Sequence, residues 1–138
     1  MKVLDYARKA PAVSPSSPLA EAANRMLVDA SDICLVADGD YVVGLLTTRD
    51  LVEAAARGVS PKLAVVEALR GPPLLLEGYE PLWKAAEVML ALGVDAAVVT
   101  VGGRCVGVLR AEDIAGLEGQ LSEASAFAEV VESYAPPA

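Results

Sequence analysis

The sequence has no histidine, only two cysteines and few aromatic residues, and each shortage excludes a class of protein or site. Histidine is the commonest general base, so an enzyme built on this chain would depend on carboxylates, lysine or tyrosine. Two distant cysteines without histidine do not form a structural zinc site. We therefore interpret Cys34 and Cys105 as small buried hydrophobic residues, and whether they form a disulfide is left open.

Basic residues and long apolar runs are also scarce. The chain has 11 Lys and Arg against 19 Asp and Glu, with a formal net charge of −8. Nucleic acids and anionic membrane surfaces normally bind basic patches, so neither is an expected partner. No apolar stretch reaches the roughly 18–20 residues of a membrane-spanning helix. Asp5, Arg8 and Lys9 interrupt the N-terminus where a signal peptide would be apolar. We expect a soluble, cytoplasmic protein.

The residues that are plentiful indicate a folded chain. Hydrophobic residues make up 54% of the 138 residues and aromatic residues only 4%, so the core is expected to consist mainly of Ala, Val and Leu. A chain of this length fits one domain of ordinary size or two small fused ones.

The sequence repeats itself, and the repeat determines how the fold is interpreted. The segments "SPLAEAANRML" (17–27) and "EPLWKAAEVML" (80–90) align at an offset of 63 residues. The same offset relates "VVGLLTTRDL" (42–51) to "CVGVLRAEDI" (105–114) without a gap. Upstream, "VLDYARKAP" (3–11) resembles "VVEALRGPP" (65–73) at an offset of 62. Two copies of a unit of about 60 residues therefore account for most of the chain.

Each copy has the pattern of a β-α-β-β-α unit. A short extended segment (11–14 or 74–77) precedes a helix that is expected to have Pro18 or Pro81 at its first helical position. Apolar residues then recur at helical spacing, "DICLVAD" (32–38) predicts a buried strand, and the Asp38–Asp40 turn predicts a hairpin. "TRDLVEAAARG" (48–58) predicts a closing helix that ends at Gly58. We expect an α/β fold in which two such repeats pack sheet to sheet with pseudo-twofold symmetry.

The predicted boundaries are 1–60 for the first repeat, 61–116 for the second and 117–138 for a C-terminal extension. Apolar residues in the extension follow helical spacing, which predicts an amphipathic helix. Packing on its own repeats and contact with a dimer mate or partner are left open for this helix. The residues with this spacing are Leu121, Ala124, Phe127, Ala128 and Val131.

This plan resembles a tandem pair of CBS domains, also called a Bateman module. The resemblance covers about residues 1–116 and depends on the two matching helices, the buried strands and the pattern Gly-apolar-apolar-Thr-x-x-Asp-apolar at 44–51, repeated at 107–114 with Arg110 in place of Thr. It implies a stand-alone, non-catalytic regulatory module, usually a homodimer, that needs no cofactor. It also implies two clefts between the repeats for AMP, ADP, ATP, S-adenosylmethionine or a dinucleotide, with the motif Asp on the ribose and the motif Thr on phosphate.

The resemblance implies two unequal sites. The first is expected to consist of Thr47, Arg49, Asp50, Leu75, Leu76, Asp95, Ala96 and Ala97. The second, in which Arg110 either clamps a phosphate or fills the cleft, is expected to consist of Ala12, Val13, Ser14, Asp32, Ile33, Cys34, Arg110 and Asp113.

Thr-x-x-Asp at the start of a helix is also a capping box, which needs no ligand. Because Asp113 is present without the capping Thr, we favour the ribose role for both carboxylates, although Asp113 also suits a helix N-terminus electrostatically. The function expected is a sensor of an adenine nucleotide, preferably AMP, that acts on an unidentified regulated protein. The alternatives are a dimerisation module with degenerate sites and a sensor of S-adenosylmethionine or a dinucleotide.

Overall fold

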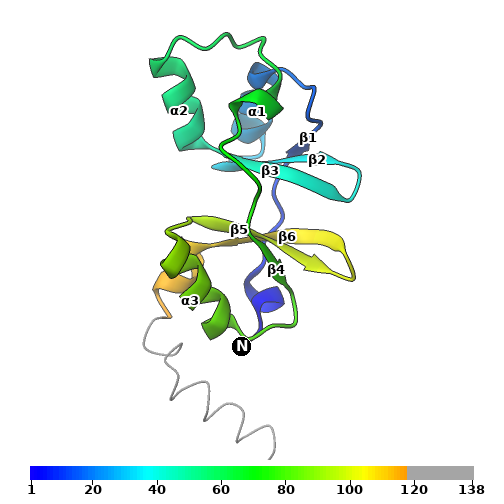
Figure 1. Ribbon diagram of the computed structural model, residues 1–138, viewed down its shortest axis with the longest axis vertical. Coiled ribbons are helices and arrows are strands. Elements are labelled where there is room, and N and C mark those ends of the chain that lie inside the picture. Colours follow the sequence, from blue (N-terminus) through cyan, green and yellow to red (C-terminus); the bar gives the residue numbers. More distant parts are fainter. Residues whose placement is uncertain (118–138) are drawn as a thin grey trace, which may run out of the picture.

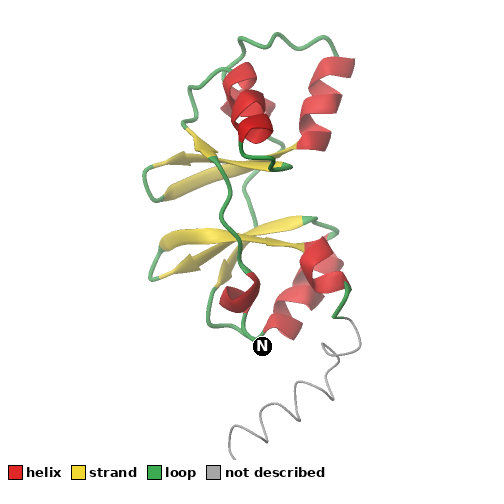
Figure 2. Ribbon diagram, turned by 180° about the vertical axis from the view of Figure 1, so that it is seen from behind, coloured by secondary structure: helices red, strands yellow, loops and turns green. Residues whose placement is uncertain are grey.

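The computed structural model describes residues 1–117, and the predicted helix of the C-terminal extension lies outside them. Two three-stranded sheets face each other, and the helices lie on their outer sides (Figures 1 and 2). The first sheet has the order β1 (Ala12–Val13), β2 (Ile33–Asp38), β3 (Tyr41–Thr47), and the second has the order β4 (Leu75–Glu77), β5 (Ala96–Val101), β6 (Arg104–Arg110). In each sheet the first two strands are parallel and the last two antiparallel.

The helices repeat in the same way. The first half contains α1 (Leu19–Val28) and α2 (Thr48–Ala56), the second half α3 (Leu82–Leu92) and α4 (Ala111–Ala115). Short 3-10 helices, η1 (Val3–Tyr6) and η2 (Val65–Ala68), precede the two halves. Within residues 1–117, no helix is both long and apolar enough to cross a membrane. The predicted β-α-β-β-α order of both repeats is confirmed.

The local sequence explains where these elements begin and end. Pro18 and Pro81 are the N-caps of α1 and α3, one residue before the first helical residue rather than at it. Gly93 ends α3 in a left-handed conformation, with φ of 65°, which glycine adopts without strain. Both hairpins have a register shift at the same place in the repeat, between Val36 and Ala37 and between Val99 and Thr100.

The central strands are buried on both faces. In β2, Cys34 and Val36 pack against the helices of the first half, whereas Ile33 and Leu35 pack toward the second sheet. The strand β5 alternates in the same way. The contact between the sheets is therefore a third core, made of Ile33, Leu35, Val42, Ala96, Val98 and Val108. This confirms that each repeat covers the sheet face that the other leaves open.

The two halves also exchange their leading segments. Val3 of η1 is buried in the core of the second half, and Val65 of η2 in that of the first. The Val3 amide donates to the Glu80 carbonyl at 3.0 Å and the Val65 amide to that of Ser17 at 2.8 Å. The sequence boundaries at 60 and 116 divide the repeats, whereas each packed core also includes the leading segment of the other repeat.

A close backbone contact holds the first exchanged segment, and it yields a test. Arg8 pairs with Val108 of β6, and a Cβ added to the neighbouring Gly107 would lie 2.8 Å from the Arg8 carbonyl oxygen. The Arg8 carbonyl belongs to the backbone and cannot rotate away from the added methyl group as a side chain could. We therefore expect Gly107→Ala to lower the free energy of unfolding by about 1–3 kcal/mol in urea denaturation. Gly71→Ala, whose Cβ meets nothing within 4 Å, is the control. Equal stability of the two variants would contradict the exchange of segments.

Candidate functional site

A cavity of about 280 Å³ lies where the two repeats meet. Equivalent parts of both halves line it: the residues just before or at the start of β2 and β5, the last residue of β3 and of β6, and the first residues of α2 and α4. The lining residues are Asp32, Ile33, Thr47, Thr48, Arg49, Asp95, Arg110, Ala111 and Glu112. The cavity is therefore built by the repeat itself and lies close to its pseudo-twofold axis.

Hairpin register explains why these residues converge. The first residue of each central strand pairs with the last residue of its neighbour, Ile33 with Thr47 and Ala96 with Arg110. The first amide of the following helix then donates to the residue before the central strand: Thr48 to the Asp32 carbonyl at 3.0 Å, and Ala111 to that of Asp95 at 2.8 Å. Each repeat thus presents an acid, a strand end and a helix start at one point.

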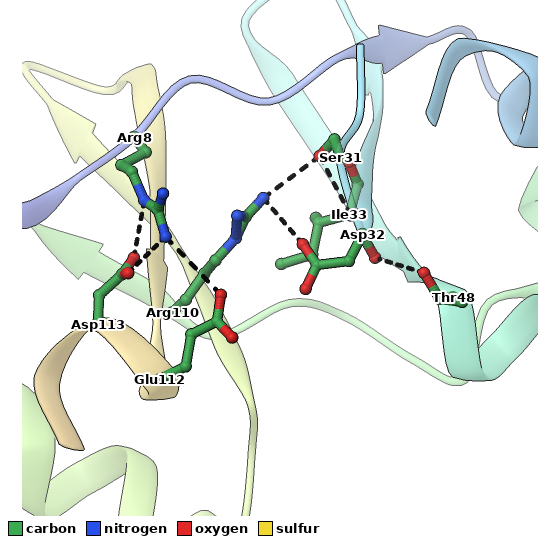
Figure 3. A network of polar contacts seen from close by, with 8 residues as sticks. All are labelled: Arg8, Ser31, Asp32, Ile33, Thr48, Arg110, Glu112 and Asp113. Carbon is green, nitrogen blue, oxygen red and sulfur yellow. Dashed lines mark hydrogen bonds and ion pairs between the residues drawn. The ribbon is translucent and has the colours of Figure 1, made fainter. Parts of the chain in front are cut away.

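Arg110 breaks the symmetry of this arrangement. From the end of β6 its Nη2 crosses to the first half, 3.2 Å from Asp32 Oδ1 and 3.3 Å from Ser31 Oγ (Figure 3). Its side chain is 11% exposed, and its buried Nε has no acceptor among the residues that the structure describes. An unsatisfied buried donor costs about 1–3 kcal/mol, so this guanidinium is only partly satisfied by the protein.

The capping box is formed in the first repeat. The Thr47 amide donates to Asp50 Oδ2 at 2.9 Å, and the Asp50 amide donates to Thr47 Oγ1 at 3.2 Å. At the start of α4, Arg110 makes no such side-chain cap. The Thr and Asp of the first motif therefore both have a structural role, and the ribose role of Asp50 stays a prediction.

Both motif carboxylates are also held by arginines. Arg8 Nε donates to Asp113 Oδ2 at 2.9 Å, and its Nη2 donates to Oδ1 of the same carboxylate (Figure 3). Arg70 Nε lies 3.2 Å from Asp50 Oδ1, and its Nη2 pairs with Glu53. The hydrogen bond from Arg70 lowers the pKa of Glu53 below its ordinary value of 4.5.

These two arginines were not among the predicted site residues. Arg8 and Arg70 occupy equivalent positions in the segments that align at an offset of 62. That alignment was the feature of the sequence that could have identified them as a related pair. Their partners could not be inferred from it, because each arginine reaches its carboxylate only through the exchange of the leading segments.

The cavity unites residues that were predicted for two separate sites. The same space is lined by residues of both predicted sites: Thr47, Arg49 and Asp95 of the first, and Asp32, Ile33 and Arg110 of the second. Asp50 does not line it, but lies at a second hollow of about 310 Å³ between α2 and the segment around η2. Asp113 is held by Arg8 and does not line the inter-repeat cavity either.

The remaining predicted residues lie away from this cavity. Four of them have their side chains in the cores of the two halves: Val13, Cys34, Leu76 and Ala97. Ala96 packs between the sheets, and Leu75, Ala12 and Ser14 are exposed. Residues that line the cavity but were not predicted are Thr48, Ala111 and Glu112, each next to a predicted residue.

Comparison with known proteins identifies the architecture. The CBS domain family model matches the sequence twice, at residues 3–57 and 65–118. The chain belongs to the CBS domain family. Its two CBS domains form a tandem pair, and domains of this family are generally regulatory and non-catalytic. No curated protein has a detectably similar sequence.

Solved CBS structures share this fold at low sequence identity. The CBS domain protein PAE2072 from Pyrobaculum aerophilum, complexed with AMP, matches with a TM-score of 0.77 and 17% identity over 95% of this chain and 99% of that chain. The CBS domain pair of protein MJ0100, in complex with 5′-methylthioadenosine and S-adenosyl-L-methionine, matches with a TM-score of 0.74 and 23% identity over 88% and 98%. ATU1752 from Agrobacterium tumefaciens matches with a TM-score of 0.74 and 22% identity over 86% and 99%.

The direction of the Cys34 side chain can be tested chemically. Both cysteines are free, Cys34 is fully buried in the core of the first CBS domain, and burial raises the pKa of its thiol to about 11. We expect iodoacetamide at neutral pH to alkylate the half-buried Cys105 and to leave Cys34 unmodified until the protein unfolds, as read by mass spectrometry. Alkylation of native Cys34 at the rate of Cys105 would show instead that Cys34 faces a solvent-filled cleft.

Proposed function

We propose that this CBS pair is a non-catalytic sensor that binds an adenine nucleotide between its two domains, AMP in preference to ADP or ATP, and acts on a separate regulated protein. The observation that supports this most is the cavity to which both domains contribute at equivalent residues. A ligand there contacts both domains at once, so its binding can change how they are held together.

The chemistry of the cavity suits a nucleoside monophosphate. Thr47 and Thr48 supply hydroxyl groups beside the first amides of α2, and Arg49 and Arg110 supply positive charge. About 280 Å³ lies just below the roughly 300–1,000 Å³ of typical small-molecule pockets, which favours a mononucleotide over a dinucleotide. The acids Asp32, Asp95 and Glu112 also line the space, and their repulsion disfavours further phosphates.

The ribose contact requires an exchange of partners. Asp50 lies outside the lining of the inter-repeat cavity, so the ribose has to extend beyond it toward the start of α2. Asp50 accepts from the Thr47 amide through Oδ2 and is paired with Arg70 through Oδ1, so the ribose hydroxyls also have to replace the arginine. Arg70 is exposed and also pairs with Glu53, so it keeps a partner when it releases Asp50. AMP complexes of two similar CBS proteins, PAE2072 and CBSX2, support this choice of ligand.

S-adenosylmethionine is a second candidate, favoured by the same three acids. Its sulfonium and ammonium groups are cationic, so Asp95 and Glu112 would attract it where they repel a polyphosphate. The solved CBS pair of MJ0100 contains this ligand. Direct comparison of the ligands on this protein decides between the two candidates.

Thermal shift with AMP, ADP, ATP and S-adenosylmethionine tests the proposal. A ligand at a hundredfold excess over its Kd stabilises the folded state by about 2.7 kcal/mol, which raises the Tm by several degrees. We expect the largest shift with AMP. The largest shift with S-adenosylmethionine would instead favour the second candidate. No shift with any of the four at millimolar concentration would refute the sensor and leave a structural module.

The ribose role of Asp50 has its own test. Asp50→Asn keeps an acceptor for the Thr47 amide and removes the charge, so α2 should remain capped while AMP binds about tenfold or more weakly in calorimetric titration. Asp40→Asn, in the exposed β2–β3 turn, is the control and should bind as wild type. Wild-type affinity of Asp50→Asn would remove Asp50 from the site without refuting AMP binding in the inter-repeat cavity, which Asp50 does not line.

The proposal includes a homodimer. Leu27 of α1 and Leu90 of α3, equivalent in the two repeats, are 81% and 85% exposed, and Val28 and Leu92 beside them are also exposed. Large apolar side chains exposed at equivalent positions of two outer helices favour an interface to which both repeats contribute. We expect light scattering to give twice the chain mass of 14.2 kDa and Leu27→Glu with Leu90→Glu to give the single mass. A wild-type protein of single mass at micromolar concentration would contradict the dimer.

A further inference from the structure

We infer that Arg110 selects for a phosphate group on the ligand, and that it releases Asp32 when it binds this phosphate. The inference rests on the proposed nucleotide function and deepens it. It assigns the choice between phosphorylated and unphosphorylated adenosine ligands to one side chain. It also assigns the structural consequence of that choice to one contact between the two CBS domains.

Arg110 has donor capacity that the protein leaves unused. Its Nη2 is shared between Asp32 and Ser31, while the buried Nε has no acceptor among residues 1–117. A guanidinium binds a phosphate best through two parallel donors. The side chain lines the inter-repeat cavity, so a phosphate in that space can bind the guanidinium, and the buried Nε gains an acceptor once the side chain turns away from Asp32.

The contacts that Arg110 would give up are exchangeable. Asp32 is 56% exposed, so its carboxylate can be hydrated once the arginine leaves. Ser31 keeps its other partners, because its hydroxyl donates to the Ile33 carbonyl at 2.7 Å and accepts from the Ile33 amide at 3.2 Å. A ligand phosphate therefore competes with a partly exposed carboxylate, not with a buried ion pair.

Among residues 1–117, the cavity has one such arginine and not two. At the equivalent position of the first domain stands Thr47, whose hydroxyl caps α2. Arg49, the other cation of the cavity, is exposed and lies 3.5 Å from Glu53. The pair of domains thus has one strong phosphate contact near its axis, which fits a ligand with a single phosphate.

The exchange links ligand binding to the domain contact. In the structure Arg110 connects the second domain directly to the first through Asp32 (Figure 3). A phosphate that takes Arg110 replaces this direct contact with one that passes through the ligand. The contact between domains then depends on whether the ligand has a phosphate, and adenosine cannot reproduce the effect of AMP.

Calorimetric titration with AMP and with adenosine tests the inference. We expect wild type to bind AMP about ten- to a hundredfold more tightly than adenosine, the range of a charge-assisted hydrogen bond. Arg110→Gln should lose this ratio and keep its affinity for adenosine. Arg104→Gln removes an exposed arginine of the same strand, 3.7 Å from Asp40, and should keep the ratio. An unchanged ratio in Arg110→Gln would overturn the inference.

Asp32→Asn tests the exchange without altering Arg110. Because the competing charge is removed, AMP should bind more tightly and adenosine equally, whereas unchanged AMP affinity would refute the competition. Inorganic phosphate separates this inference from the proposed function. If wild type binds neither AMP nor adenosine, the proposed function fails. The Tm measured with millimolar inorganic phosphate then still tests whether Arg110 binds the anion. A rise in wild type and Arg104→Gln but not in Arg110→Gln supports the anion contact, and an equal response of all three refutes it.

Discussion

The rest of this structure depends on the burial of two apolar sheet faces against each other. Each sheet is covered by its own helices on one side, so residues such as Ile33, Leu35 and Val98 reach a dry environment only when the other sheet covers them. Burying each such side chain contributes about 1.5–3 kcal/mol. The same contact brings the ends of β3 and β6 together, and the inter-repeat cavity forms where these ends meet. Stability and the candidate site therefore have one origin.

The interactions around the candidate site differ in kind from those of the cores. The cores are apolar and include the leading segment of the opposite repeat, through Val3 and Val65. The motif carboxylates are instead held by arginines on those same segments, and Arg110 is held by a partly exposed acid. In each of these ion pairs one partner is more than half exposed to water and the other is largely buried. The exposed partner can be hydrated when the pair opens, so a ligand can replace it without loosening the cores.

The internal repeat made most of the fold predictable, because a match at an offset of 63 in both helix and hairpin requires two like units. The site was predicted less well. Consecutive residues such as Ile33 and Cys34 were assigned to one cleft, but strand residues alternate between faces, and Cys34 lies in a core. The union of two expected sites in one cavity depends on how the repeats face each other. The pairing of Arg8 with Asp113 depends on an exchange that no local pattern encodes.

The central claim is that an adenine nucleotide binds where the two CBS domains meet. Mapping the backbone amide chemical shifts of the whole protein during a titration with AMP tests it most directly. The account predicts saturable shifts that are largest at residues of both domains that line this cavity and not the groove between α3 and α4: Asp32, Thr48, Arg110 and Glu112. Saturable shifts confined to the groove between α3 and α4, lined by Trp83 and Leu90, or to one domain alone, would contradict it.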